Sequence, residues 1–436
     1  MKRKGWLVFG GVLTIALATQ IQSCAKKDET SSSSAVTYGS TSSTGDFAQW
    51  TVDGSSVTAI WQVTESATGA IKRTLNITAT CSAADATYGY KSCTINSGSC
   101  TAGTGSCSGE TPSAGSVFKM LEVPGTAIFV HAGTGGAAGS GGDSDQLHVG
   151  FTLDTNCSDV AGDYTFMKVG KAQRDLFGIF RLNSDFSSIT HATIGANTAS
   201  CNGSTSSGGC TATPAWAMSE TGSELNAMSV TPSCAGGVRT LNLGGGKTAR
   251  TIRSTGGTFI FDLPSGEGGI VGMPVANAAT AADFANKTFN GIAFPDNGGP
   301  QLMAVSTGAV TSGAAALTSI SFMGGMSPGI SSATIAPLTV TPATTAAAPG
   351  YPTNSGTAGV MNAGSALTST YATVGAIPGV FKIDGTFSDA GRVVMVAGKV
   401  NGKVLAFGSV YNWRNNQFGF SGTAYANSGA FILFEK

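Results

Sequence analysis

The sequence predicts an all-β protein of two mostly antiparallel β-sandwich or β-barrel domains, with disulfides stapling the first half. Short segments alternate between apolar and polar residues, as half-buried strands do. Only residues 275–285 carry a pattern that suits a short helix. Asn401-Gly402 separates two apolar runs, and an Asn-Gly pair in that position is the strongest short signal of a β-hairpin.

The predicted strands begin with a hairpin near the N-terminal end of the chain. Val57, Ala59 and Trp61 are separated by single residues that are mainly polar, and residues 74–79 repeat this alternation. Residues 65–69 between them have the composition of a turn. Further strands are predicted over residues 126–131, 147–153, 164–169, 176–182 and 258–262.

The clearest hairpin lies late in the chain, over residues 393–400 and 403–410. A type I′ turn at its Asn-Gly pair sets the register, so that Val396 pairs with Phe407. Both faces of this hairpin are apolar, which predicts a central position in a sheet. Another hairpin is predicted over residues 418–425 and 430–434.

Two pairs of segments suggest an internal repeat. The segment Gly125–Phe129 is similar to Gly257–Phe261, and Asp159–Phe166 is similar to Asp283–Phe289. A repeat of this kind predicts related structural units. We therefore expect two β domains, the first containing the disulfides, over residues 47–235 and 236–436.

One stretch of the second predicted domain has a low-complexity composition. Residues 324–372 are rich in Ala, Thr, Ser, Gly and Pro, which is typical of a long surface excursion or a linker. Residues 325–329 within it match G-x-S-x-G, the motif of a hydrolase nucleophile elbow. That motif requires a later histidine, and the last histidine of the chain is His191. Residues 325–329 are therefore expected to form a glycine-rich loop. We expect that the protein is not an enzyme.

The N-terminus has the three parts of an export signal. Basic residues 2–4 are followed by a mostly apolar run over residues 6–18 and then by small and polar residues. This run is shorter than the ~20 apolar residues that a membrane-spanning helix needs. The segment therefore predicts a secretory signal peptide.

The segment Ile21–Cys24 resembles the lipobox of bacterial lipoproteins, although Ile and Gln replace the usual Leu and small residue at its first two positions. The resemblance implies a signal peptide over residues 1–23, with a lipid on Cys24. Ala25, in place of the aspartate that often retains lipoproteins in the inner membrane, implies the outer membrane. The expected side is the cell surface, with the periplasm as the alternative. Residues 24–46 are polar, which predicts a flexible tether.

Cysteine usage supports export. Besides Cys24 the chain has an even number of cysteines, which in an exported protein predicts up to four disulfides. The closest spacings, Cys93 to Cys100 and Cys100 to Cys107, are too wide for the close pairs of a zinc site, and no histidine stands near these three cysteines. Cys201 with Cys210 is the best single pair. The candidates are Cys81, Cys93, Cys100, Cys107, Cys157, Cys201, Cys210 and Cys234.

A metal site has only weak candidates. His131 and His148 stand on two predicted strands joined by a connection that contains Asp143 and Asp145. If the two imidazoles face each other across a hairpin, they suit a transition metal. Calcium is the only other cofactor considered, since carboxylates are its usual ligands. The candidate calcium ligands are Asp143, Asp145, Asp154, Asp159 and Asp163.

Composition limits the functions that remain. Lys plus Arg and Asp plus Glu both number 24, and charged residues make up only 11% of the chain, which excludes a basic nucleic-acid binder. The leading hypothesis is a lipid-anchored surface protein that recognises a protein, a glycan or another cell surface without catalysis. A β-barrel carrier of a small apolar ligand is the first alternative. A metal-dependent hydrolase at His131 and His148 is the second.

Overall fold

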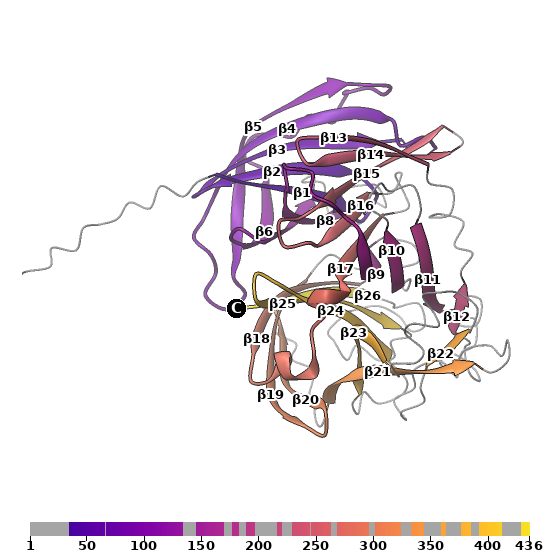
Figure 1. Ribbon diagram of the computed structural model, residues 1–436. Coiled ribbons are helices and arrows are strands. Elements are labelled where there is room, and N and C mark those ends of the chain that lie inside the picture. Colours follow the sequence, from indigo (N-terminus) through magenta and orange to yellow (C-terminus); the bar gives the residue numbers. More distant parts are fainter. Residues whose placement is uncertain are drawn as a thin grey trace, which may run out of the picture. The chain divides into compact units, whose positions relative to one another are not determined.

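The computed structural model shows three antiparallel β-sheets that follow one another along the chain (Figure 1). In each sheet most neighbours in sequence are neighbours in space, and the last strand pairs with the first. The structure describes residues 35–65, 67–133, 145–169, 177–182, 189–196, 216–219, 229–244, 246–262, 268–295, 301–323, 333–343, 359–362, 376–384, 392–411 and 429–436.

The first sheet is a closed barrel, because β8 returns to pair with β1. Its strands alternate as the sequence predicts: Val57, Ala59 and Trp61 are buried inside, whereas Thr58 points outward. The strands are β1 (Val36–Ser42), β2 (Phe47–Asp53), β3 (Ser56–Thr64), β4 (Ile71–Cys81), β5 (Tyr90–Ala102), β6 (Val117–Val123), β7 (Ala127–Gly133) and β8 (Asp145–Thr152).

The second sheet has nine strands in the order β12-β11-β10-β9-β17-β16-β15-β14-β13. Its first and last strands in sequence, β9 and β17, are neighbours in its middle. The strands are β9 (Gly162–Val169), β10 (Phe177–Leu182), β11 (Ile189–Ala196), β12 (Trp216–Ser219), β13 (Ser229–Ala235), β14 (Val238–Gly244), β15 (Lys247–Arg253), β16 (Phe259–Asp262) and β17 (Gly269–Pro274).

The third sheet is also closed. Its order is β20-β19-β18-β26-β25-β24-β23-β21-β22, and an additional β20–β21 pairing joins the ring, with β22 parallel to β21. The strands are β18 (Thr288–Pro295), β19 (Gln301–Thr311), β20 (Ala314–Phe322), β21 (Ala333–Ala343), β22 (Gly359–Asn362), β23 (Ala376–Asp384), β24 (Arg392–Val400), β25 (Lys403–Tyr411) and β26 (Gly429–Glu435).

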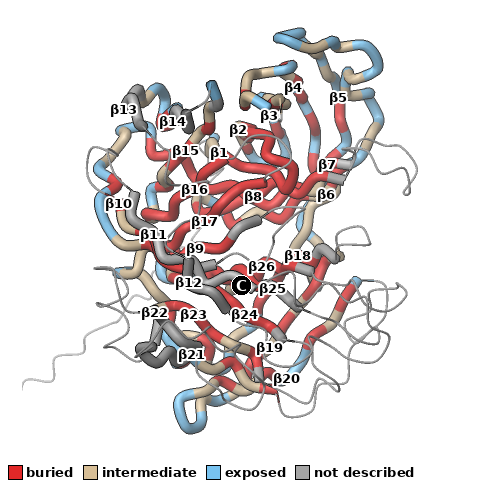
Figure 2. The backbone as a smooth tube through the Cα atoms, turned by 90° about the vertical axis from the view of Figure 1, so that its right-hand side faces the viewer, coloured by how far each residue is buried: buried red, intermediate tan, exposed pale blue. Residues whose placement is uncertain are grey.

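Each sheet has an apolar cluster of its own, and a further cluster joins all three. Phe129 of β7 stacks on Phe434 of β26, and Phe151 of β8 lies edge to face with Phe407 of β25. The same cluster includes Ile260 of β16, so it draws on every sheet. In Figure 2 the buried segments of β8, β16 and β26 lie toward the middle of the described part of the molecule.

Three hairpin turns meet beside this shared core. They are the turns that precede the second-to-last strand of each sheet, between β6 and β7, β15 and β16, and β24 and β25. The Asn401 side chain donates to Thr126 Oγ1 at 2.8 Å. Thr152, which ends β8 beside the β6–β7 turn, shares a hydrogen bond of 2.9 Å with Thr255. A Cβ on Gly256 would lie 2.6 Å from Val400. The three sheets thus use equivalent hairpins to contact one another.

The predicted all-β class, with antiparallel barrels and disulfides in the first half, is confirmed. The predicted repeat falls on equivalent strands: Gly125–Phe129 and Gly257–Phe261 lead into β7 and β16, each second to last in its sheet. The segments 159–166 and 283–289 likewise lead into β9 and β18, each first in its sheet.

The predicted division at residues 235 and 236 falls at the turn between β13 and β14, where Ala235 pairs with Val238. Both sides of that division therefore contribute to one sheet. The first strand begins at Val36, inside the segment predicted as a tether, and its Ser40 is fully buried. The described part of that polar segment is therefore a strand, with Ser40 directed into the barrel and Thr41 hydrogen-bonded to Asp262 of β16.

The late hairpin is as predicted. Val396 pairs with Phe407, and Asn401 and Gly402 both have positive φ, as a type I′ turn requires. The partner strand predicted over residues 418–425 lies outside the described residues, whereas β26 covers residues 430–434.

Two other expectations differ from the structure. The helix predicted at 275–285 is replaced by two short 3₁₀ turns, η1 (Val275–Asn277) and η2 (Ala281–Phe284), because Phe284 packs against strand residues and the chain soon enters β18. The excursion at 324–372 contains β21, whose β-branched residues supply the strand that closes the third sheet. Among the described residues no helix is long and apolar enough to span a membrane.

Candidate functional site

The outer surface of β3, β4 and β5 forms a regular array of uncharged polar side chains, which we call the polar face. Neighbouring strands are about 4.8 Å apart and successive outward residues about 6.8 Å apart along a strand. Ile60, 45% exposed, is its one large apolar residue. The face consists of Ser56, Thr58, Ile60, Gln62, Thr74, Asn76, Thr78, Thr80, Thr94, Asn96, Ser97, Ser99 and Thr101.

Hydrogen bonds between strands hold this array in place. Thr78 and Ser97 share a hydrogen bond of 2.7 Å between their hydroxyl groups. The Asn96 amide donates to Thr80 Oγ1 at 2.9 Å. The register sets Thr58 beside Thr78, so the rows continue from β3 to β5. Cross-strand polar pairs of this kind stabilise a sheet and restrict the positions of its side chains.

Two disulfides brace the same strands. Cys81 and Cys93 are register partners on β4 and β5 and are bonded. Cys100 of β5 is bonded to Cys107 in the loop that follows. Charged outward side chains lie only at the ends of this part of the barrel, with Asp53 beside Ser56 and Lys72 beyond Thr74. Figure 2 shows exposed and buried residues alternating along β4.

The interior of the same barrel is filled by its own side chains. Tyr38, Trp50 and Phe118 are buried there together with aliphatic residues from neighbouring strands. At one end, the Tyr38 hydroxyl donates to Glu122 at 3.0 Å, and Lys91 pairs with Glu122 at 2.6 Å. Burial, and then the charge of Glu122, raises the pKa of Tyr38. The third sheet likewise encloses a packed apolar cluster.

A second polar group lies toward the other end of the barrel interior, around His148. The His148 ring is fully buried and lies edge to face with Trp50 and Trp61. Its Nδ1 is 3.3 Å from Ser40 Oγ. Burial lowers the pKa of His148 from 6.5 to about 3, so the imidazole is neutral at physiological pH. Asp46, also buried, accepts hydrogen bonds from the Gln146 side chain and from the Thr64 backbone.

The structure does not bring His131 and His148 together. Val130 is the register partner of His148, and His131 is one residue further along β7. Neighbouring residues of a strand point to opposite faces, so His148 points into the barrel while His131 points out. His131 instead borders a small pocket with Lys119 and Ile292. The paired-histidine arrangement considered from the sequence is therefore not formed.

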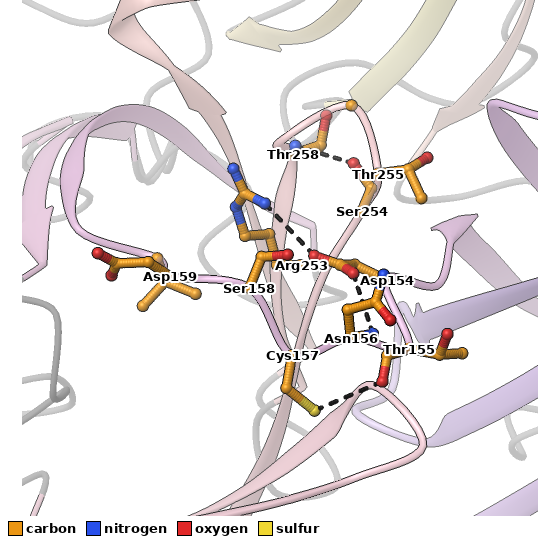
Figure 3. Close-up of polar contacts among 12 residues, drawn as sticks. Asp154, Thr155, Asn156, Cys157, Ser158, Asp159, Arg253, Ser254, Thr255 and Thr258 are labelled. Carbon is orange, nitrogen blue, oxygen red and sulfur yellow. Dashed lines mark hydrogen bonds and ion pairs between the residues drawn. The ribbon is translucent and has the colours of Figure 1, made fainter.

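The carboxylates proposed for calcium have other partners. Asp163 forms a two-pronged ion pair with Arg181, at 2.6 and 2.7 Å. Asp154 Oδ2 lies 3.4 Å from Arg253 Nη1, and Asp154 Oδ1 accepts a hydrogen bond from the backbone N–H of Asn156 (Figure 3). Burial opposes its ionisation, but hydrogen bonds from Ser158 and Asn156 and the charge of Arg253 hold the pKa of Asp154 below its ordinary value.

Asp159 accepts the backbone N–H of Ala161, and Figure 3 shows its carboxyl group directed away from the Asp154 pair. Asp143 lies outside the described residues, and Asp145 begins β8. Within the described ranges, no three His, Cys, Asp or Glu side chains form a group that could hold a metal ion.

Six of the eight candidate cysteines are paired, including Cys157 with Cys234, which joins the start of the second sheet to β13. Cys201 and Cys210 lie outside the described residues, as do Cys24 with its lipobox and the motif at 325–329.

Sequence reasoning missed the polar face. Its signal is the period-two run of Thr and Asn over residues 74–80 and the Ser and Thr residues over 94–101, which mark one face of neighbouring strands. The sequence does not show which strands are neighbours. A scan against profiles of known protein families and searches of curated proteins and of solved structures found no match to this chain.

Proposed function

We propose that this protein is a surface-anchored lipoprotein that recognises a neutral glycan through the polar face of β3, β4 and β5. The observation that carries this proposal is a broad strand surface of hydroxyl and amide groups without a charged residue among them. Such groups both donate and accept hydrogen bonds, as sugar hydroxyls do.

Charge complementarity supports a neutral partner. An acidic polymer would need Lys or Arg on the contact surface, and a basic one would need Asp or Glu. The outward positions from Ser56 to Gln62 and from Thr74 to Thr80 offer neither. Because the array repeats along and across the strands, it suits a polymer that presents the same hydroxyl groups at regular intervals.

The packed interiors support surface recognition over transport. A carrier needs an enclosed space for its ligand, usually several hundred Å³. Trp50 and Tyr38 fill the middle of the first barrel, and Phe381 and Met395 pack inside the third sheet. Recognition by a rigid outer face requires no such space.

The proposal is tested by affinity electrophoresis of the full-length protein through gels that contain neutral or sulfated polysaccharides. We expect retardation by at least one neutral polysaccharide. This retardation should not change when the salt concentration is raised about tenfold, to about 0.5 M, because salt screens only interactions between charges. Retardation by sulfated polymers alone, lost in high salt, would contradict a neutral partner. Absence of binding to every neutral polymer would contradict the proposal as well.

Anchoring is tested separately. Cys24→Ala is expected to abolish incorporation of radioactive palmitate and to release the protein from the membrane fraction, because stable attachment depends on the acyl chains. Equal labelling of the variant and the wild type would contradict lipid attachment at Cys24. Cys234→Ala, at a cysteine far from the lipobox, serves as the control and should keep its label.

A further inference from the structure

The interior of barrel β1–β8 contains hydrogen-bonding atoms that the protein leaves without a partner. Trp61 Nε1 and His148 Nε2 are both buried, and neither has a hydrogen-bond partner. Their rings lie edge to face with centroids 4.8 Å apart. Gln146 Oε1, two residues before His148 on the same strand, is also buried without a partner.

The surrounding hydrogen bonds determine which nitrogen of His148 carries the proton. The Ser40 hydroxyl donates to the backbone oxygen of Ala48 at 3.2 Å and accepts from Trp50 Nε1 at 3.0 Å. A hydroxyl has one proton to donate, so His148 Nδ1 must be the donor toward Ser40 Oγ. His148 Nε2 therefore carries a lone pair and is an acceptor.

Trp61 and His148 thus present one donor and one acceptor to the same interior. Trp61 Nε1 can only donate, and His148 Nε2 in this tautomer can only accept. Both side chains are at least nine-tenths buried, so bulk solvent does not serve them. Buried polar groups in native proteins are almost always paired with protein or with ordered water.

We propose that the first barrel contains an internal binding site for a single water molecule between Trp61 Nε1 and His148 Nε2. The molecule accepts from the indole N–H and donates to the imidazole lone pair. An anion would face the acceptor His148 without a positive partner, and a cation would face the indole N–H. The burial of His148, which keeps its imidazole neutral, supports an uncharged occupant.

The test is nuclear magnetic resonance of the full-length protein labelled with ¹⁵N in its tryptophan indoles. We expect a direct cross-relaxation peak between the Trp61 indole N–H and water, assigned by its loss in Trp61→Phe. Trp50, whose indole N–H donates to Ser40, is the internal control and should give no such peak. His148→Phe, which removes the acceptor, should abolish the Trp61 peak, and His148→Gln should keep it.

A folded wild-type protein whose Trp61 indole shows no water peak would overturn the proposal. A Trp61 peak that persists unchanged in folded His148→Phe would overturn the role of His148 as the second partner. If His148→Phe does not fold, the wild-type spectrum with its Trp50 control still decides whether a water molecule binds at the Trp61 indole.

Discussion

At the scale of single residues, the first barrel is unusual for the polar side chains that it buries. Ser40, Asp46 and His148 are all essentially inaccessible to solvent. Sequence reasoning singled out His148 only as a weak candidate metal ligand, because period two does not reveal which face of a strand points inward. In the structure the buried imidazole instead lies edge to face with two tryptophans.

Burial of His148 predicts a pH dependence of stability. The folded state binds the imidazole proton only near pH 3, whereas the unfolded chain binds it near pH 6.5. Between these values the unfolded state holds more protons, so stability is lost as the pH falls below about 6.5. This group contributes a loss of at most about 1.4 kcal/mol per pH unit.

Urea unfolding at pH 7.0 and pH 5.0 measures this effect. His148→Gln, which has no titrating group, should lose less stability than the wild type over the same interval. The His191→Gln variant is the control for a general effect of removing histidine. An identical pH dependence in wild type and His148→Gln would contradict the burial argument.

At the scale of elements, the sequence predicted strands well and their partners poorly. The β24–β25 hairpin could be predicted down to its register, because its turn is encoded by two adjacent residues. Pairings such as β8 with β1 join residues far apart in the chain, and no local pattern encodes them. The polar face was missed for this reason, since it exists only when β3, β4 and β5 lie side by side.

Alanine substitutions at two glycines of the β24–β25 hairpin should lower the free energy of unfolding by different amounts. Gly402 has a φ of +78° and open space around it, so Gly402→Ala costs only the left-handed backbone, about 1 kcal/mol. At Gly408 a Cβ would lie 1.9 Å from the Phe431 ring, so Gly408→Ala forces a rearrangement of the core. Overpacking of this kind costs about 1–3 kcal/mol or more. Urea unfolding should rank Gly408→Ala as the less stable variant, and the reverse order would contradict the packing of β25 against β26.

The disulfides of the first barrel predict a link between stability and binding. Removing Cys81–Cys93 by double alanine substitution should cost about 3 kcal/mol, as for a loop of similar length, and should loosen the polar face. The Cys157–Cys234 disulfide joins no two strands of that face. Thermal unfolding should show a loss for both variants, but only the first should bind the neutral polysaccharide more weakly. Equal binding by the two variants would contradict recognition through the polar face.

At the scale of the whole described chain, three consecutive sheets share one apolar core and contact one another through equivalent hairpins. One pair of the repeated segments, Gly125–Phe129 and Gly257–Phe261, falls on two of these hairpins, and the other pair falls on the first strands of the second and third sheets. Two features of the first sheet distinguish it: the disulfide that links β4 to β5, and an outer surface of hydroxyl and amide groups. The recognition that we propose therefore belongs to the first sheet.

The most direct test of this account compares one charged substitution on the polar face with the same substitution elsewhere. Thr78→Asp places a carboxylate in the middle of the face, whereas Ser319→Asp places one at an exposed position of β20. Both variants should fold, since both positions are exposed. Affinity electrophoresis with the neutral polysaccharide should show binding weakened about tenfold or more by Thr78→Asp, an energy of about 1.4 kcal/mol, and unchanged by Ser319→Asp. Equal affinity for the two variants, or a loss confined to Ser319→Asp, would contradict recognition by β3, β4 and β5.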